Sequence, residues 1–285
     1  MMRCISILLV VVLLTGCQQA PEPTAELPTL ASMGGDAVPT AVSSVGGAFA
    51  GRSELRSIEV FDAIVLNLPA SVVISAGTEP SLEISADDGV LPLIQSTVSE
   101  SVLDLRAASD ANFQNARISI RAVVPALRAL TVNGAGDVQI SSFVVQSLQI
   151  DLNGIAAIAL QPVTAESITV NLAGTGSIDF ATATAITFSV NMGGSGRISA
   201  AGNVEELLVT SPGGGEFVGQ ELTARAARFD IAGTLTAFVS VLETLDVQMS
   251  GGGTVTFGGT PQVNASITGS GSVRDSAGNI VAGSG

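Results

Sequence analysis

Eight glycines recur at nearly constant spacing from residue 134 onward in this chain of 285 residues. The steps between successive members, from Gly134 to Gly269, are 20, 20, 20, 19, 20, 18 and 18 residues. A period near twenty is typical of a stacked repeat, in which each unit packs mainly against its neighbours. Six of the eight open a Gly-x-Gly, and the predicted corner glycines are Gly134, Gly136, Gly154, Gly174, Gly176, Gly194, Gly196, Gly213, Gly215, Gly233, Gly251, Gly253, Gly269 and Gly271.

Apolar and polar residues alternate around each glycine. The positions four and two residues before it are mostly apolar, and a second apolar position follows four residues after it. This alternation predicts two β-strands per repeat, joined at a glycine corner, with one side of each strand in the core. A polar column separates the two apolar positions before the glycine, and it consists of Thr131, Asp151, Asn171, Asn191, Thr210, Asp230, Gln248 and Ser266.

Equivalent strands in successive repeats must pair in parallel, because every repeat runs in the same direction. The sequence therefore predicts an all-β protein, a single-stranded parallel β-helix with coils of about 20 residues. Glycine suits the corners because it accepts positive φ and leaves room for a tight bend. Ala156 and Leu235 replace the second glycine, so we expect those coils to bend differently or to carry a small bulge. An antiparallel barrel of short hairpins is the alternative, but columns that stay in phase favour stacking.

The N-terminus has the pattern of an export signal. An apolar run from Ile5 to Leu14 follows Arg3 and is too short to span a bilayer as a helix. The run ends in Leu14-Thr15-Gly16-Cys17, which resembles the bacterial lipobox. This resemblance implies cleavage before Cys17, lipidation of that cysteine, and anchoring of the exported chain to the bacterial envelope. Gln18 then favours the outer membrane of a diderm cell.

The chain divides into five predicted segments. Residues 1–16 are the lipoprotein signal peptide, and residues 17–51 form a flexible tether rich in Pro, Ala, Ser and Gly. Residues 52–128 are irregular N-terminal β coils, which we expect because a terminal repeat must close one end of a stack. Regular rungs occupy residues 129–275, and residues 276–285 are a flexible Gly/Ser tail.

Composition excludes several kinds of chemistry. The net charge is −14, and the chain contains no His, Trp, Tyr or Lys. Catalytic triads and metal sites that need His are therefore excluded, as is Lys-based catalysis. The acidic chain is a poor match for nucleic acid. We expect no cofactor and no metal site.

Carboxylates and amides remain as candidate functional groups. Asp137, Asp151 and Asp179 lie on nearby rungs, so a polysaccharide-processing enzyme, a glycosidase or a lyase, is one hypothesis. Solvated outer-face residues are the simpler interpretation of the same three side chains. The polar column offers a candidate interaction face, whose members are Asp151, Asn171, Asn191, Asp230 and Gln248.

One segment carries a family resemblance. Phe61-Asp62-Ala63-Ile64, followed by short strands and Gly-x-Gly rungs behind a lipobox, resembles the head GIN domain family of auto-transporter adhesins, over roughly residues 57–275. The resemblance implies a right-handed β-helix and a bacterial surface or periplasmic protein, and it supplies no catalytic residues. We therefore expect a non-enzymatic, lipid-anchored envelope protein that binds or adheres through its β-helical surface to an envelope or surface partner. A polysaccharide-processing enzyme and a structural spacer are the alternatives.

Overall fold

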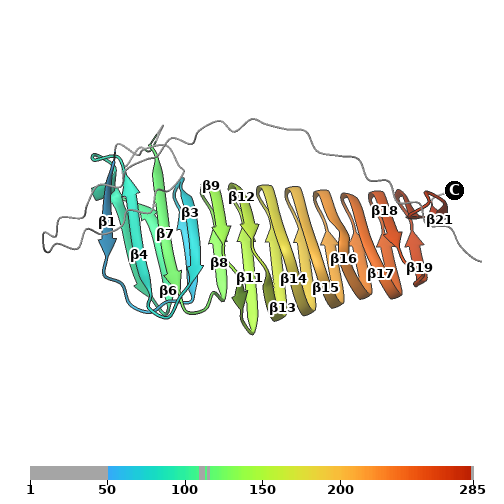
Figure 1. The fold of residues 1–285 in the computed structure, drawn as a ribbon. Coiled ribbons are helices and arrows are strands. Elements are labelled where there is room, and N and C mark those ends of the chain that lie inside the picture. Colours follow the sequence, from blue (N-terminus) through green and yellow to red (C-terminus); the bar gives the residue numbers. More distant parts are fainter. Residues whose placement is uncertain (1–50, 109–112, 114–115, 284–285) are drawn as a thin grey trace, which may run out of the picture. The chain divides into compact units, whose positions relative to one another are not determined.

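The computed structural model describes residues 51–108, 113 and 116–283, which form stacked β coils (Figure 1). The predicted signal peptide, the predicted lipidation site Cys17 and the predicted tether up to residue 50 lie outside the described residues. The only helical element among the described residues is a 3-10 turn, η1 (Leu91–Leu93). The strands are β1 (Arg52–Arg56), β2 (Ala63–Asn67), β3 (Ser71–Ala76), β4 (Ser81–Ala86), β5 (Ile94–Ser99), β6 (Val102–Ala107), β7 (Ile118–Val124), β8 (Ala129–Val132), β9 (Ala135–Ile140), β10 (Phe143–Val144), β11 (Ser147–Leu152), β12 (Ile155–Leu160), β13 (Val163–Leu172), β14 (Thr175–Met192), β15 (Ser195–Ser211), β16 (Gly214–Ile231), β17 (Thr234–Met249), β18 (Gly252–Gly258), β19 (Gln262–Ile267), β20 (Ser270–Asp275) and β21 (Ile280–Gly283).

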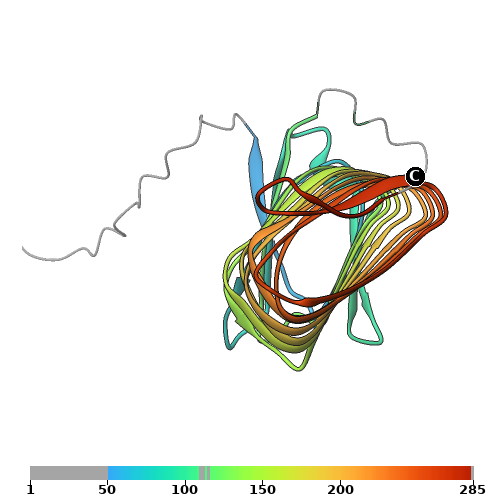
Figure 2. The same cartoon turned by 90° about the vertical axis from the view of Figure 1, so that its right-hand side faces the viewer.

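Each regular coil contributes to three parallel sheets. The first sheet stacks β8, β11, the ends of β13 to β17, and β19. The second sheet stacks β9, β12, the beginnings of β14 to β17, β18 and β20. A short third sheet begins with β10 and continues through the middle of the longer strands. Viewed along the stack, the coils superimpose as flattened loops (Figure 2). The parallel β-helix is confirmed and the antiparallel barrel is wrong, while the right-handed sense stays a prediction.

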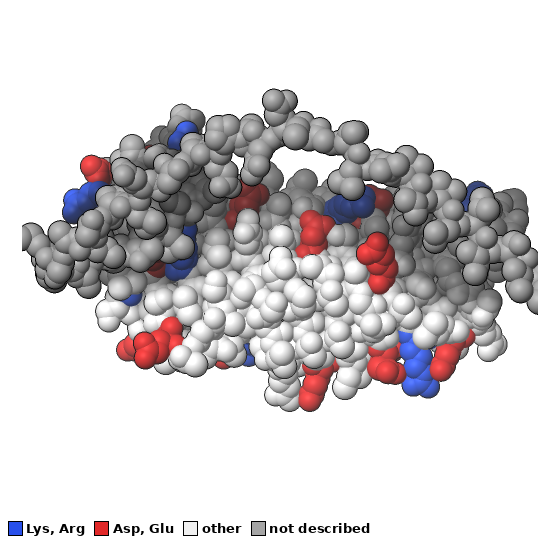
Figure 3. All heavy atoms as spheres, viewed as in Figure 1, with Lys and Arg blue, Asp and Glu red and all other residues white. Residues whose placement is uncertain are grey.

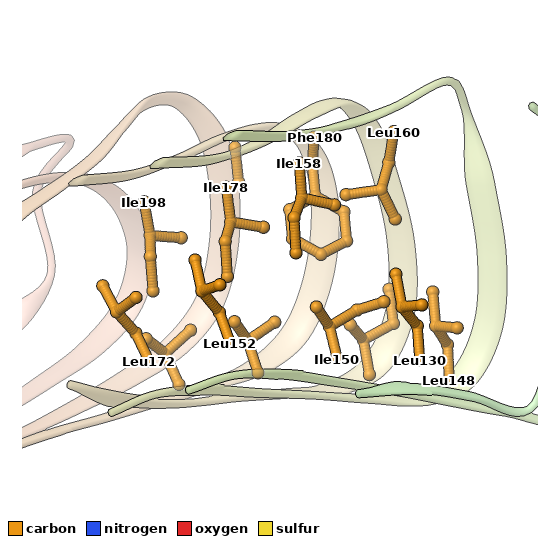
Figure 4. Close-up of a cluster of buried hydrophobic side chains, with 14 of the residues drawn as sticks. Leu130, Leu148, Ile150, Leu152, Ile158, Leu160, Leu172, Ile178, Phe180 and Ile198 are labelled. Carbon is orange, nitrogen blue, oxygen red and sulfur yellow. The ribbon is translucent and has the colours of Figure 1, made fainter. Parts of the chain in front are cut away.

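Inward columns of apolar side chains fill the coils. Leu130 and Ile150 from the first sheet face Ile158 and Ile178 from the second, and all four are at most 1% exposed (Figure 4). The rings of Phe180 and its neighbour Phe188 meet edge to face, with 5.2 Å between their centroids. The core is continuous because each coil adds its inward residues to the same columns.

The N-terminal coils are stacked out of sequence order. β2 pairs in parallel with β6 on one side and with β8 on the other. In the same way, β3 lies between β7 and β9. Antiparallel strands close this end, because β4 pairs with β7, β1 pairs with β4, and β5 forms a hairpin with β6. The two-residue hairpin loop, Glu100 and Ser101, has φ of 52° and 63°, as a type I′ turn requires.

Close stacking favours glycine at both positions of a corner. A Cβ on Gly154, the first glycine of its corner, would lie 1.9 Å from the carbonyl oxygen of Gly134 in the preceding coil. A Cβ on Gly176, a second glycine, would lie 1.9 Å from the carbonyl oxygen of Ala156. Gly176 also has φ of 151°, which side-chain-bearing residues rarely adopt, so backbone conformation favours glycine there as well.

Ala156 and Leu235 hold the second-glycine position without a bulge. Ala156 pairs in register with Gly136 and Gly176, and Leu235 pairs with Gly215 and Gly253. The predicted bulge is therefore wrong at both positions, whereas the alternative expectation, a different bend, is met, since the glycines paired with them have positive φ. Neither residue has positive φ, and both side chains are buried. The register instead shifts at the corners on either side of the third sheet, mainly between the second and third sheets and, from β16 to β17, also between the third and first, so coil length changes without disturbing either long sheet.

The C-terminal residues correct another expectation. Part of the predicted flexible tail, residues 280–283, forms β21, which pairs in antiparallel fashion with β20. The turn between them is closed by the carboxylate of Asp275, which accepts hydrogen bonds from the backbone N and the Nδ2 of Asn279, both at 2.8 Å. Gly278 has φ of 88° in this turn. The Gly and Ser content of the segment therefore marks a hairpin turn as well as a chain end.

Candidate functional site

The polar column predicted from the sequence lies in register on the outer side of the first sheet. Asp151, Asn171 and Asn191 pair across successive coils, and Asp230 and Gln248 continue the column. The carboxylate of Asp151 accepts hydrogen bonds from Asn171 Nδ2 at 2.7 Å, Gln149 Nε2 at 2.8 Å and Thr131 Oγ1 at 3.3 Å.

These contacts leave little of the Asp151 carboxylate for a ligand. Its donors come from its own coil and from the coils on both sides, so the carboxylate joins three coils. Because charge-assisted hydrogen bonds are strong, this part of the column stabilises the stacking of the three coils. Asn191, Asp230 and Gln248 are exposed and remain the accessible members of the predicted interaction face.

The three carboxylates of the enzyme hypothesis are not brought together. Asp151 lies on the first sheet, whereas Asp137 and Asp179 lie on the second. Asp137 is in register with Ser177, and Asp179 is two residues further along and two coils away from Asp137. At about 4.8 Å per coil, this places Asp137 and Asp179 about 10 Å apart along the stack.

A lateral groove missed by the sequence analysis follows the corner between the second and third sheets. It consists of two adjoining hollows of about 360 and 410 Å³, which share Ala159 and Gln161 as lining residues. One outward column of the second sheet runs through both hollows and gives one residue from each of six coils. In stack order these are Val73, Gln139, Ala159, Asp179, Ser199 and Val218.

The hollow of about 360 Å³ lies where one coil is a residue shorter than its two neighbours. In the coils of β14 and β16, three residues form the corner between the second and third sheets. In the coil of β15 the same corner has only two residues, Ala200 and Ala201. The β15 corner is therefore recessed between Ala181 on one side and the Gln220–Glu221 segment on the other, and all of these residues line the hollow. The 19-residue step from Gly194 to Gly213 is the sequence signal for this recess.

The charged groups that line the groove are carboxylates. Asp179 accepts a hydrogen bond from the hydroxyl of Ser199, and Glu221 is exposed on the opposite wall. No Arg is among the lining residues of the two hollows. The nearby guanidinium of Arg197 is paired with Glu216 on the same sheet. The groove is therefore a region of negative potential.

Charged side chains are otherwise scattered over the stack. In the view of Figure 3, acidic and basic residues lie toward the margins, and uncharged surface covers much of the middle. No group of three or more acidic or Cys side chains within the described part of the chain is placed to hold a metal ion. Within that same part, no helix has the length and apolar character needed to cross a membrane.

The residues of the family motif connect the out-of-order coils. Phe61 is 1% exposed and belongs to the core. The carboxylate of Asp62 accepts hydrogen bonds from the guanidinium of Arg128, at 3.1 Å from Nη2, and its backbone oxygen accepts from Arg128 N at 2.7 Å. The side-chain hydrogen bond to Asp62 raises the pKa of Arg128. This pair holds the start of β2 against the segment that enters β8.

Comparisons with known proteins agree with this architecture. The family model described as "Putative auto-transporter adhesin, head GIN domain" matches residues 60–261. A crystal structure of a "putative lipid binding protein" from Parabacteroides distasonis has a TM-score of 0.72 at 22% identity, covering 79% of this chain and 96% of its own. A "putative adhesin" from Parabacteroides merdae has a TM-score of 0.66 at 19% identity, covering 79% of this chain and 95% of its own.

At these identities the two structures show a shared fold. A search of curated proteins found no match. The family model spans most of the chain, from β2 to the start of β19, and the motif that suggested the family takes part in the core and in the Asp62–Arg128 contact. The chain belongs to the head GIN domain family.

Proposed function

We propose that this protein is a non-enzymatic, lipid-anchored protein of the bacterial envelope, which binds a surface or envelope partner through the side of its β-helix. The observation that carries the proposal is the lateral groove, in which two adjoining hollows share Ala159 and Gln161 and together cross six coils of the stack. Its length suits an extended partner. Membership of a family described as adhesins supports an envelope location and a role in contact.

Binding is tested with the full chain displayed on lipid vesicles. The vesicles are mixed with an isolated cell-envelope fraction, and co-sedimentation is compared with vesicles that display an unrelated acidic lipoprotein. We expect several-fold greater retention of the vesicles that carry this chain. Equal retention of both would count against a binding function and favour the structural spacer.

Lipid anchoring is tested separately at Cys17. We expect the wild-type chain to incorporate labelled palmitate and to fractionate with membranes, because the segment before Cys17 resembles a lipobox. A Cys17→Ser variant should lose the label and move to the soluble fraction. Unchanged membrane association of the variant would show that the anchor is elsewhere.

A polysaccharide-processing enzyme is the second candidate, because the groove carries two carboxylates. Asp179 and Glu221 lie two coils apart, about 10 Å along the stack. This is just beyond the separation of roughly 6.5–9.5 Å found in inverting glycosidases, so the two side chains would have to lean toward each other to act as a pair. Release of reducing ends from a polysaccharide panel, abolished by Asp179→Asn, would favour this candidate. Absence of release, or release that persists in Asp179→Asn/Glu221→Gln, would reject it.

A further inference from the structure

We propose that the lateral groove binds an extended peptide segment that carries basic side chains. This inference deepens the proposed function and rests on it, because it names the class of partner for the same surface. Four features of the groove lead to it: its charge, its length, the character of its floor and its lack of exposed aromatic rings.

Charge selects a cationic partner. The two charged residues that line the hollows, Asp179 and Glu221, are both acidic. The net charge of the whole chain, −14, adds a repulsive field for anions. Anionic polysaccharides and phosphate-rich polymers are therefore disfavoured. A partner with Lys or Arg side chains would gain charge-assisted hydrogen bonds to both carboxylates.

Length and spacing match an extended chain. The groove column has five steps between Val73 and Val218, which is about 24 Å at the spacing of β-strands. An extended peptide rises by about 3.3 Å per residue, so about seven residues would fill this distance. Side chains on one face of an extended peptide recur every second residue, so basic residues two or four positions apart would lie about 7 or 13 Å apart, within reach of Asp179 and Glu221 given the length of Lys and Arg side chains.

The floor and walls suit a peptide. Ala159, Ala181 and Ala201 leave a shallow apolar floor, on which the aliphatic stems of Lys or Arg can lie. The side-chain amides of Gln139 and Gln161 each offer both a donor and an acceptor, as a peptide backbone requires.

Neutral polysaccharide is a poorer match for the same groove. Sugar rings are commonly held by stacking on exposed aromatic side chains, and the chain has no Trp or Tyr. Phe180 lines the first hollow, but it is 3% exposed and belongs to the core. The groove therefore offers hydrogen bonds and charge, without an aromatic platform.

The test uses fluorescent heptapeptides and the full chain purified in mild detergent. One peptide alternates Lys with Ala, the second has Glu in place of Lys, and the third has Ser. A neutral cello-oligosaccharide is the glycan probe. Fluorescence anisotropy gives the affinity of each peptide, and competition with the labelled Lys peptide gives the affinity of the glycan. Both are measured at low and at physiological ionic strength, because salt screening weakens non-specific electrostatic attraction.

Two groove variants separate charge from shape. Asp179→Asn/Glu221→Gln removes both carboxylates, and Ala159→Gln fills the point where the hollows join without changing charge. Ala159 is exposed, so this second substitution leaves the core intact. The matched control, Glu166→Gln/Glu206→Gln, removes the same charge from exposed positions outside the groove. Circular dichroism melts confirm that each variant is folded.

We expect the Lys peptide to bind in preference to the other probes. Each groove variant should weaken the affinity for the Lys peptide by about tenfold or more. The control should stay within about twofold of wild type. Equal weakening by the charge variant and the control, unchanged binding in Ala159→Gln, or tighter binding of the glycan would each overturn the inference. Envelope retention by vesicles that persists in the groove variants would leave the proposed function standing while rejecting this site.

Discussion

The side-chain amide of Asn133 donates a hydrogen bond to Oδ1 of Asn67 over 2.7 Å, although 66 residues separate them in the chain. Asn153 donates to Asn133 at 2.9 Å, and Asn67 donates to Asp104 at 2.9 Å. The resulting ladder of side-chain hydrogen bonds crosses four coils, in the order Asp104, Asn67, Asn133 and Asn153. It therefore joins the out-of-order N-terminal coils to the first regular ones.

Asn133→Ala should lower the stability of this junction. The substitution removes two side-chain hydrogen bonds of the ladder, and we expect a loss of about 0.5–1.5 kcal/mol because the site is exposed and its partners can bind water. The measurement is the midpoint of urea unfolding. Asn203→Ala, an exposed asparagine outside the ladder, is the control and should have little effect. Equal effects of the two substitutions would argue against a role for the ladder.

Gly154→Ala should be strongly destabilising. The added methyl would lie 1.9 Å from the carbonyl oxygen of Gly134, so the backbones of two coils must move apart. Overpacking of this kind costs at least about 1–3 kcal/mol, which should appear as a lower melting temperature. Gly89→Ala is the matched control, since its added methyl meets no atom within 4 Å. A Gly154→Ala protein as stable as Gly89→Ala would contradict the close stacking.

Ser211→Ala should stabilise the protein. Ser211 occupies an inward column between Met192 and Ile231, is fully buried, and its hydroxyl has no hydrogen-bond partner among the described residues. Replacing the hydroxyl by hydrogen removes a desolvated polar group, for a gain of about 1 kcal/mol. Ser189→Ala, at a partly exposed outward position, serves as the comparison. Thermal unfolding measures both variants, and a destabilised Ser211→Ala would refute the expectation.

The C-terminal hairpin should open in acid. The pKa of Asp275 is lowered below its ordinary value of about 3.9. The main cause is the hydrogen bond from the side chain of Asn279, and the hydrogen bond from the backbone of Asn279 is the second. The ionised carboxylate therefore supports the turn above that ordinary value, and its contribution is lost as pH falls through the lowered pKa. Hydrogen exchange of β21 amides, corrected for the intrinsic pH dependence, measures this opening. Asp275→Asn should remove the pH dependence, and protection that is constant with pH in the wild type would contradict the assignment.

The regular part of the fold could be predicted from the sequence. Stacking forces every coil to place the same kind of residue at the same position, so columns such as Leu130, Ile150 and Val170 are visible without a structure. The Gly154–Gly134 contact explains why the glycine spacing is so regular, because a larger residue there would push two coils apart. The family resemblance could also be read from the sequence, because the Phe61–Ile64 motif and the Gly-x-Gly rungs follow one another in a recognisable order.

Three features could not be predicted, each for its own physical reason. The order of the N-terminal coils depends on contacts such as Asn67–Asn133 and Asp62–Arg128. The groove depends on the difference in corner length between neighbouring coils, which a single 19-residue step marks only faintly. The tail hairpin depends on one carboxylate, Asp275, in a segment whose composition is typical of a linker.

The position of β2 and β3 between later strands constrains how the chain acquires its structure. Both strands lie in one coil, yet their partners, β6 to β9, are all encoded after them. A chain that emerges with its N-terminus first cannot wind this stack in the order of emergence. The first coil gains its parallel partners on one side only when β6 and β7 have followed, and on the other side only when residue 140 has followed. Such delayed, long-range pairing is slow, so the N-terminal end sets the pace of folding and is the stretch that stays accessible to proteases and chaperones for longest.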